Sequence, residues 1–558
     1  MNVNRYIKMK HMYNIRKFIV PFIAGALFIN LNTYAQIPPD TVVAAADAPA
    51  NWHTLDLKTD GFYGISLAPA YNLVKGKKSK TVVVATIDSG IDTAHKDLKS
   101  VLWVNAKEIA GNGKDDDKNG YVDDINGWNF LGGPGGKANY TETTEEVREY
   151  NRLKGKYASL TQATATNKKE YAYWLKVKAI RDSTVSKAQV ESEQISPVLN
   201  ALMASSGFIK RSLNLAADAS FTKDDLSKVN ADNDTVMRSK MVWESVFAQD
   251  GGKDAAHIIK GLSEYLAKLN NDLNPDLTSR QRIMGDDPDV WDTKPYGNNL
   301  LKFPDASHGT GVSGLIGAVH GNNYGINGVA DNVRIMGIKA VPNGDEYDKD
   351  VAKAIRYAVD NGAKIINMSF GKKLSPHKKW VDDAYKYAAA KDVLLVQASG
   401  NDGQNADSTF HYPNDTFEDG SSTDAANVIS VGASSAKNDE QLAGNFSNYG
   451  KKNVDIFAPG VSVTSIDKDA EFNVADGTSF ASPIVAGVAA LVLEYYPALS
   501  ARQLKQVILQ SATPVNTLVI KPGSKEDKVN FATLSKTGGI VNAYRALQIA
   551  ATLKGERK

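Results

Sequence analysis

Three side chains in this sequence could together make a nucleophile. Asp88 ends the apolar run "VVVATID", His308 opens "SHGTGVSGLIGAV", and Ser479 stands before the apolar run of "DGTSFASPIVAGVAALVL". A serine hydroxyl is a poor nucleophile unless an imidazole takes its proton, and the imidazole needs a carboxylate to orient it. Taken singly, a turn aspartate, a structural histidine and a helix-capping serine explain these residues equally well. Taken together, in the order Asp, His, Ser, they predict nucleophilic catalysis.

A parallel sheet covered by helices would bring these positions together. Between apolar runs lie segments of helical pattern, such as "DKDVAKAIRYAVDNG" and "PHKKWVDDAYKYAAAKD". This alternation predicts an α/β fold, a doubly wound and mainly parallel sheet flanked by helices, whose functional residues collect beyond the carboxyl ends of strands. We expect strands in the apolar runs at residues 80–88, 332–341, 363–370, 392–400, 427–433 and 454–460.

The run after Ser479 carries no charge on any face, which predicts a buried helix. Pro483 is expected in the first turn or so of that helix, where a missing backbone donor is tolerated. A buried helix rich in small residues also explains the sequence by packing alone. If the helix positions a nucleophile, it holds Ser479 rigidly.

Residues 137–300 interrupt the α/β pattern. They follow the flexible "LGGPGGK", are rich in Lys, Glu, Ala and Tyr, and contain segments of helical periodicity such as "EEVREYNRLKGKYASL". We interpret them as a mainly helical insertion; a partly disordered linker is the alternative. The expected organisation is a signal peptide at 1–35, a first part of the α/β domain at 36–136, the insertion, and a second part with C-terminal helices at 301–558.

The first 35 residues have the pattern of a secretory signal peptide. A basic start precedes the short apolar core "FIVPFIAGALFI", and cleavage is expected after Ala35. An uncleaved membrane anchor is the alternative. The protein is therefore expected to be secreted or periplasmic, without stable membrane insertion once the signal is removed, since no other long apolar run suits a membrane.

Composition excludes several classes of protein. The 558 residues are 42% hydrophobic and 23% charged, which is ordinary for a globular protein. The net charge of +2 becomes −3 without residues 1–35, so no basic surface suggests a nucleic-acid partner. The absence of Cys rules out disulfides and a thiol nucleophile. The sequence does not indicate an oligomeric state.

The three motifs "TIDSGID", "HGTGVSGLIGA" and "GTSFASPIVAG" resemble those of the subtilisin-like serine proteases (subtilases). The resemblance covers about residues 50–130 and 301–512. It implies that Asp88 orients His308, that His308 acts as general base and then general acid, and that Ser479 attacks a peptide carbonyl. Asn401 in "LLVQASGND" is similar to the family's oxyanion-binding asparagine, with the Ser479 N–H as the second donor.

The same resemblance implies a cleft for protein or peptide substrates. The segment around "PNGDEY" (342–347) resembles the edge strand that pairs with the substrate backbone. His411 in "FHYPND" is expected at the floor of the pocket for the residue before the scissile bond, where it narrows that pocket. The residues expected to bind substrate are Ser369, Phe370, Gly371, Ala398, Ser399, Gly400 and His411.

The loop "GNGKDDDKNGYVDDINGWNF" resembles a calcium-binding loop. Its carboxylates would repel one another without a cation, but its twelfth position is Asn126 where an EF-hand has a bidentate Glu. A solvated acidic turn is the alternative to a structural Ca²⁺ site; no organic cofactor is expected. The candidate ligands are Asp115, Asp117, Asn119, the Tyr121 carbonyl and Asp123.

Three functions compete for this sequence. The first is a secreted endopeptidase, and the second is a non-catalytic, protease-like binding module that uses the helical insertion for recognition. The third, an esterase of the α/β-hydrolase kind, is rejected because its G-x-S-x-G serine comes first in the chain, whereas "GTSFA" comes last and ends in Ala481.

Two departures from compact subtilases stand out. Asp88 and His308 lie 220 positions apart, because the insertion falls between them. Residues 36–87 leave little room for the family's inhibitory pro-domain, so we expect folding and activation to differ from the usual pattern.

Overall fold

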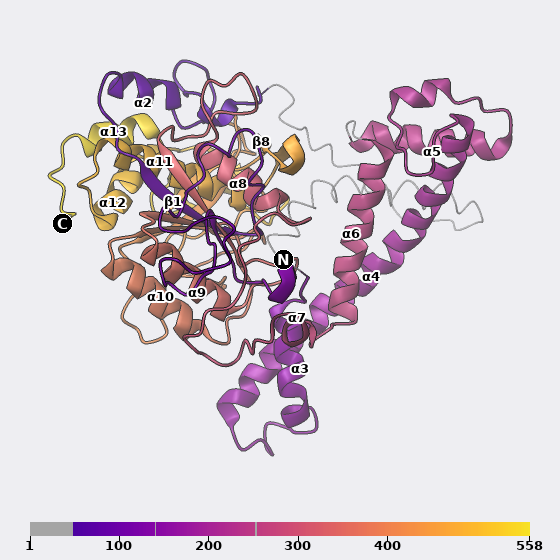
Figure 1. Ribbon diagram of the computed structural model, residues 1–558, viewed down its shortest axis with the longest axis horizontal. Helices are drawn as coiled ribbons and strands as arrows, with labels where there is room; N and C mark the ends of the chain where they lie inside the picture. Colours follow the sequence, from indigo (N-terminus) through magenta and orange to yellow (C-terminus); the bar gives the residue numbers. More distant parts are fainter. Residues whose placement is uncertain (1–47, 140, 251–253, 558) are drawn as a thin grey trace. The chain divides into compact units, whose positions relative to one another are not determined.

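The computed structural model describes residues 48–139, 141–250 and 254–557, and the predicted signal peptide lies outside them. The described chain forms two compact units, drawn in Figure 1. We call residues 48–145 and 277–557 the sheet unit, and residues 146–276 the helical unit. The helical unit is therefore shorter at both ends than the insertion expected at 137–300.

A buried ionic cluster explains why residues 277–300 belong to the sheet unit. Arg280 donates to Asp350 through both terminal nitrogens, at 2.7 and 2.8 Å, and to Asp286 at 2.6 Å. Lys349 reaches Asp286 at 2.5 Å, and the Tyr296 hydroxyl also donates to Asp350.

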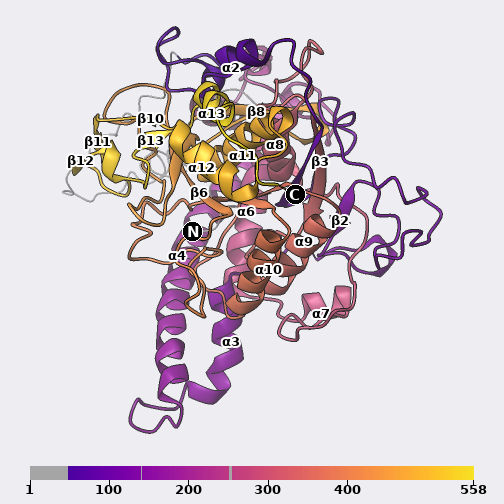
Figure 2. The same ribbon diagram turned by 90° about the vertical axis from the view of Figure 1, so that its left-hand side faces the viewer.

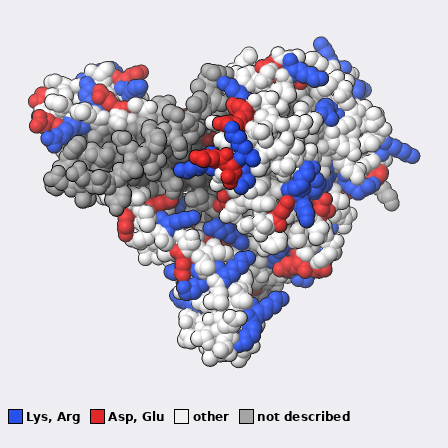
Figure 3. Space-filling model, turned by 180° about the vertical axis from the view of Figure 1, so that it is seen from behind, with Lys and Arg blue, Asp and Glu red and all other residues white. Residues whose placement is uncertain are grey.

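On the face shown in Figure 3, basic and acidic side chains of the described residues are interspersed.

The described residues of the sheet unit contain one nine-stranded sheet, in the order β10-β13-β7-β6-β5-β4-β1-β3-β2. All pairings are parallel except the one between β10 and β13, which confirms the predicted α/β fold class. The chain leaves β1 for β3 and then crosses back to β4, so the end of β1 is a topological switch point. The strands are β1 (Val82–Asp88), β2 (Gly127–Asn129), β3 (Val333–Lys339), β4 (Ile365–Met368), β5 (Leu394–Ala398), β6 (Val428–Ser434), β7 (Ile456–Pro459), β10 (Thr513–Pro514) and β13 (Gly539–Ile540).

Helices cover both faces of this sheet (Figures 1 and 2). On one face lie α9 (Asp348–Asp360) and α10 (Lys378–Ala390), whose apolar sides join the core of β1, β3 and β4. On the other lie α2 (Leu67–Val74), α8 (Ser307–Gly317), α11 (Thr478–Tyr495), α12 (Ala501–Ser511) and α13 (Ala543–Ala550). Smaller elements are α7 (Ser279–Met284) and the hairpins β8 (Val463–Ile466) with β9 (Phe472–Ala475), and β11 (Leu518–Ile520) with β12 (Lys528–Asn530).

Among the described residues, α11 is the one helix long and apolar enough to cross a membrane, but it is 94% buried. It packs on β4, β5 and β6, and is therefore the central helix of the protein core. It begins at Thr478, so Pro483 lies in its second turn and not in its first.

The helical unit has its own core. The long helix α4 (Lys168–Ser212) packs against α5 (Asp234–Asp250) and α6 (Ala255–Leu273), and α3 (Glu145–Tyr157) precedes them. The Asn167 side chain caps the start of α4 by accepting the Glu170 N–H. Trp243 and Phe221 lie in the core edge to face, with ring centres 5.0 Å apart.

Candidate active site

Asp88 and His308 form a buried hydrogen bond at the end of β1. The His308 Nδ1 lies 2.6 Å from Asp88 Oδ1, which also accepts the Ser89 N–H at 2.7 Å. Their side chains are only 3% and 6% exposed, so water screens the contact little. A carboxylate acceptor favours the proton on Nδ1, which leaves Nε2 as a base. The structure thus joins two residues that are 220 positions apart in the chain.

Small residues permit this contact. A Cβ added at Gly309 would lie 2.0 Å from the Gly90 carbonyl oxygen and 3.1 Å from Asp88 Cβ. One turn later, the Ser313 hydroxyl donates to the Thr86 hydroxyl of β1 at 3.2 Å. The first turn of α8 can therefore lie directly on the turn that follows β1.

Ser479 is held in the first turn of α11 through its backbone. Pro483 has no N–H, so the Ser479 carbonyl lacks its usual partner four residues along the helix. The Ser369 hydroxyl replaces that partner at 2.8 Å and lies 2.9 Å from the Ser482 hydroxyl. The hydroxyl of Ser369, expected near the substrate, thus bonds to the helix that carries Ser479.

Phe480 and Thr478, the two neighbours of Ser479, connect it to the other predicted residues. The Phe480 ring stands edge to face against the His308 imidazole, with centres 5.8 Å apart. The Thr478 N–H and hydroxyl both donate to Asn401 Oδ1 at 2.9 Å, which orients that amide. The sequence analysis missed Thr478, although a hydroxyl beside the serine was a readable signal.

Four polar atoms of the candidate catalytic residues are buried without a hydrogen-bond partner among the described residues. They are Ser479 Oγ, His308 Nε2, Asn401 Nδ2 and Asp88 Oδ2. Leaving one such atom unpaired costs about 1–3 kcal/mol, so a native structure keeps several together only for a purpose. The arrangement offers an oxygen, a base and an amide donor to a reacting molecule.

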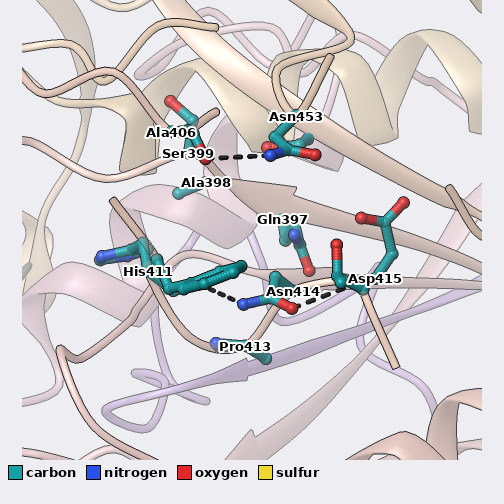
Figure 4. A pocket seen from close by; sticks show the side chains of 12 residues that line it. Gln397, Ala398, Ser399, Ala406, His411, Pro413, Asn414, Asp415 and Asn453 are labelled. Atoms are coloured by element: carbon teal, nitrogen blue, oxygen red, sulfur yellow. Dashed lines mark hydrogen bonds between the residues drawn. The ribbon is translucent and has the colours of Figure 1, made fainter. Parts of the chain in front are cut away.

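A pocket is lined mainly by residues of β5, of the loop that follows it and of β6. Its lining includes Gln397, Ala398, Ser399, His411 and Asp415 (Figure 4). A Cβ at Gly371 would lie 2.1 Å from His411 Nε2, and one at Gly400 would lie 3.0 Å from His411 Cε1. The imidazole therefore stands between the two glycines.

Burial shifts the pKa of two ionisable groups that line this pocket. Burial lowers the pKa of His411 to about 4, so the imidazole is neutral at pH 7. Burial, with Asp455 nearby, raises the pKa of Asp415 to about 6. The Phe370 side chain is only 1% exposed and packs in the core, which leaves its backbone alone to face a substrate.

The expected substrate-pairing segment at 342–347 is already bonded along one edge. The Glu142 N–H donates to the Asn343 carbonyl at 3.4 Å, and the Asp345 N–H donates to the Thr143 carbonyl at 3.3 Å. Residues just before the helical unit therefore pair beside this segment. The backbone bends at Gly344, and a Cβ added there would lie 2.1 Å from the Glu142 carbonyl oxygen.

The acidic loop gathers three carboxylates, but not the set expected from the sequence. Oxygen atoms of Glu108, Asp115 and Asp117 lie within 4.8 Å of one another. Asp123 is turned away: it accepts the N–H groups of Gly111, Asn112 and Gly113 at 2.8 to 3.2 Å. Glu108 lies before the quoted loop, and its inclusion depends on chain folding that spacing does not reveal.

The Asn119 side chain is also engaged within the loop. Its oxygen accepts the Tyr121 N–H at 2.7 Å, and its amide donates to Asp124 at 3.1 Å. The Tyr121 ring packs edge to face against Tyr357, with centres 4.9 Å apart. These contacts shape the turn that presents Asp115 and Asp117.

A buried aspartate–histidine pair next to a serine at a helix start, on the switch point of a parallel sheet, defines a site of the serine-hydrolase class. The chain belongs to the subtilase family, whose sequence profile matches residues 79–538. This confirms the assignment made from the three motifs.

Individual relatives match parts of the chain. A thermophilic serine proteinase of Bacillus sp. (strain AK1) is 41% identical over 187 residues, 33% of this chain and 42% of that protein. Subtilisin DY of Bacillus licheniformis is 36% identical over 210 residues, 37% of this chain and 70% of that protein. The cell wall-associated protease of Bacillus subtilis (strain 168) is matched over 26% of its length, so the chain spans less than half of some relatives.

Solved structures are also similar to this chain. A cold adapted subtilisin-like serine proteinase is 29% identical, covering 40% of this chain and 73% of that chain, with a TM-score of 0.32. The prenylagaramide maturation protease PagA is 28% identical, covering 44% of this chain and 82% of that chain, with a TM-score of 0.35.

Proposed function

We propose that this protein is a secreted serine endopeptidase with Ser479 as nucleophile. The observation that carries the proposal is the 2.6 Å hydrogen bond between Asp88 and His308. In the part of the chain that the structure describes, Ser479 Oγ, His308 Nε2 and Asn401 Nδ2 are buried without a hydrogen-bond partner. Membership in the subtilase family and relatives named as serine proteinases support it.

Each group has a role in this mechanism. Ser479 Oγ attacks the peptide carbonyl carbon while His308 Nε2 takes its proton, and Asp88 stabilises the resulting imidazolium. Asn401 Nδ2 and the Ser479 N–H donate to the oxyanion. The C–N bond then breaks as His308 gives its proton to the leaving amine. Water then attacks the acyl-enzyme carbonyl while His308 takes its proton. His308 returns that proton to Ser479 Oγ as the acid product leaves.

Active-site labelling tests this proposal. Signal-less protein (36–558) is treated with a fluorophosphonate and mapped by mass spectrometry, beside Ser479→Ala and His308→Ala. We expect label on Ser479, and loss of label and of casein hydrolysis in both variants. Ser408→Ala, which changes an exposed serine, is the control and retains both.

A folded protein that takes no label, before or after limited proteolysis, would refute the proposal. A non-catalytic binding module would then remain. Label that is gained only after proteolysis would instead show that the cleft was covered and would uphold the proposed chemistry.

The proposed substrate is an extended peptide with a small residue before the scissile bond. In this proposal, residues 342–347 pair with the substrate backbone, as in strand addition to a sheet edge. His411, between Gly371 and Gly400, takes space that a large side chain would need. His411→Gly should therefore raise kcat/KM for Phe over Ala at this position by about 10–100-fold, within the range that a single methylene in an apolar pocket can give. Unchanged selectivity would refute this role of His411.

We also propose that Glu108, Asp115 and Asp117 bind a structural Ca²⁺. Two oxygens on opposite sides of a calcium ion at about 2.4 Å are about 4.8 Å apart, so the spacing of these carboxylates fits. Calcium should raise the Tm of the wild type and leave that of Asp115→Asn with Asp117→Asn unchanged. An equal rise in both proteins would refute the site, as would no rise in either.

Two further proposals concern the rest of the chain. Export is tested by N-terminal sequencing of the mature protein, which should begin at Gln36.

For the helical unit we propose a role as cap, exosite or folding aid, because its ends join elements that carry Asp88 and His308. Deleting residues 146–276 should alter folding, autoprocessing or cleavage of large substrates; unchanged behaviour in all three would reject these roles.

A further inference from the structure

A buried ion pair connects the two segments that carry Asp88 and His308. Lys339, the last residue of β3, has a side chain with no exposed surface. Its ammonium donates to the Ser89 carbonyl at 2.7 Å and to Asp305 Oδ2 at 2.8 Å. Ser89 directly follows Asp88, and Asp305 precedes His308 by three residues. One cation thus holds both segments.

Further contacts make this junction specific. The Ser89 hydroxyl donates to the Asp305 carbonyl at 2.8 Å, and the Ile91 N–H donates to the Leu301 carbonyl at 3.0 Å. The Phe303 ring lies 5.4 Å from the Lys339 ammonium. The segment that returns from residues 277–300 is therefore fixed to the turn after β1 immediately before it enters α8.

We propose that Lys339 and Asp305 are positioning residues that hold Asp88 against His308 and balance the charge around the imidazole. The inference rests on the proposed peptidase activity. The chain between the two catalytic residues contains a whole helical unit, so the sequence neighbourhood does not fix their distance. The ion pair does, because the Lys339 ammonium bonds to Ser89 and to Asp305 at once only when the two segments lie side by side.

The two charges act on His308 with opposite sign. A cation disfavours the imidazolium and an anion favours it, so removing one of the two charges leaves the other unopposed. Burial raises the pKa of Asp305, and Lys339 acts against that change. Other charged groups near α8 are Asp92, Lys302 and Asp469, which pair among themselves at 2.8 to 2.9 Å.

The test compares Lys339→Met, Asp305→Asn and the double variant by kcat, KM and the pH profile of kcat/KM. A displacement of about 1 Å between reacting groups lowers turnover about 10²-fold, so each single variant should lose about that much kcat at constant KM. The acid limb should move to lower pH in Asp305→Asn, where the cation is unopposed. It should move to higher pH in Lys339→Met. The double variant should regain the wild-type limb, because neither charge is left, but not the turnover, because no ion pair then holds the two segments.

Lys505→Met is the matched control. Lys505, which lies in α12, is also buried, with a side chain that is 7% exposed. Its ammonium pairs with Asp424 at 2.6 Å. This variant should lower Tm without moving the acid limb. If the Lys339 and Asp305 variants likewise lower Tm alone and keep wild-type kcat and acid limb, the proposal is overturned.

A second measurement does not depend on turnover. In Ser479→Ala, the His308 Nδ1 proton should give a low-field ¹H resonance, which Asp305→Asn should shift or broaden and Lys505→Met should not. An unmoved resonance in Asp305→Asn would overturn the proposal even if Lys339→Met failed to fold. Failure of the peptidase proposal itself looks different, because the wild type would then neither label nor hydrolyse casein.

Discussion

The sheet unit and the helical unit are packed in different ways. In the sheet unit, α8 lies against β1 through Gly309, where even one added carbon would meet a backbone oxygen at 2.0 Å. In the helical unit, large rings fill the space: Trp243, Phe221 and Phe247 have centres 5.0 to 6.1 Å apart. Close approach without side chains fixes atoms to fractions of an ångström, whereas bulky rings bury area and tolerate small shifts.

The two units also differ in what their interiors hold. The sheet unit buries charges that must be paired, such as Lys339 and Arg280. The helical unit also buries Lys268 and Asp272 of α6, but apolar and aromatic residues fill the core cluster of α4, α5 and α6. Close packing of small residues is therefore concentrated around Asp88, His308 and Ser479, whereas large side chains hold the helices of the helical unit together.

Trp243→Ala should have the largest effect on stability. Removing a fully buried Trp side chain costs about 3–5 kcal/mol. We expect the helical unit to unfold at lower denaturant while Ser479 still takes the fluorophosphonate label, as measured by hydrogen exchange and labelling together. Trp243→Phe is the control, with a smaller loss. Simultaneous loss of label and of helical protection would show that the units are not independent.

Gly309→Ala should damage the site with a single methyl group. The added carbon must displace the Gly90 carbonyl, which separates His308 from Asp88. A displacement of about 1 Å lowers kcat about 10²-fold, equivalent to about 2.7 kcal/mol. Steady-state kinetics on a peptide substrate measure it. Wild-type kcat in this variant would contradict the close packing that we describe.

Glu494→Gln should change the pH dependence of stability. Burial, with Asp331 nearby, raises the pKa of Glu494 from 4.5 to about 9. The folded protein then keeps a proton that the unfolded chain releases, so stability is full below 4.5 and is lost as the pH rises toward 9. Between pH 6 and 8 the wild type should lose about 1.4 kcal/mol per pH unit more than the variant. Urea midpoints that change equally with pH in both proteins would contradict the raised pKa of Glu494.

Gly155→Ala in α3 should have the smallest effect. It should slightly raise stability, whereas Gly309→Ala should lower kcat. Nothing lies within 4 Å of an added Cβ there, and alanine favours a helix over glycine by about 0.5–1 kcal/mol. Thermal unfolding should show a slight gain with unchanged kcat. A loss of kcat as large as that expected for Gly309→Ala would remove the contrast between the two units.

The sequence predicts most of the sheet and the candidate catalytic residues because both leave local signals. Runs such as residues 80–88 become β1, and the uncharged run after Ser479 becomes the buried α11. The predicted limits of the helical insertion differ from the unit observed, because the ionic cluster of Arg280 and Asp350 joins residues far apart in sequence. Such pairings have no periodicity to read.

The family and the candidate catalytic residues can be read from the sequence alone, since the motifs lie in short stretches around Asp88, His308 and Ser479. How these residues are held is visible in the tertiary structure. Ser369 bonding to the Ser479 carbonyl and Lys339 joining Ser89 to Asp305 are contacts between distant segments. Their formation depends on burial and on the crossing of strands and helices, which act through space and not along the chain.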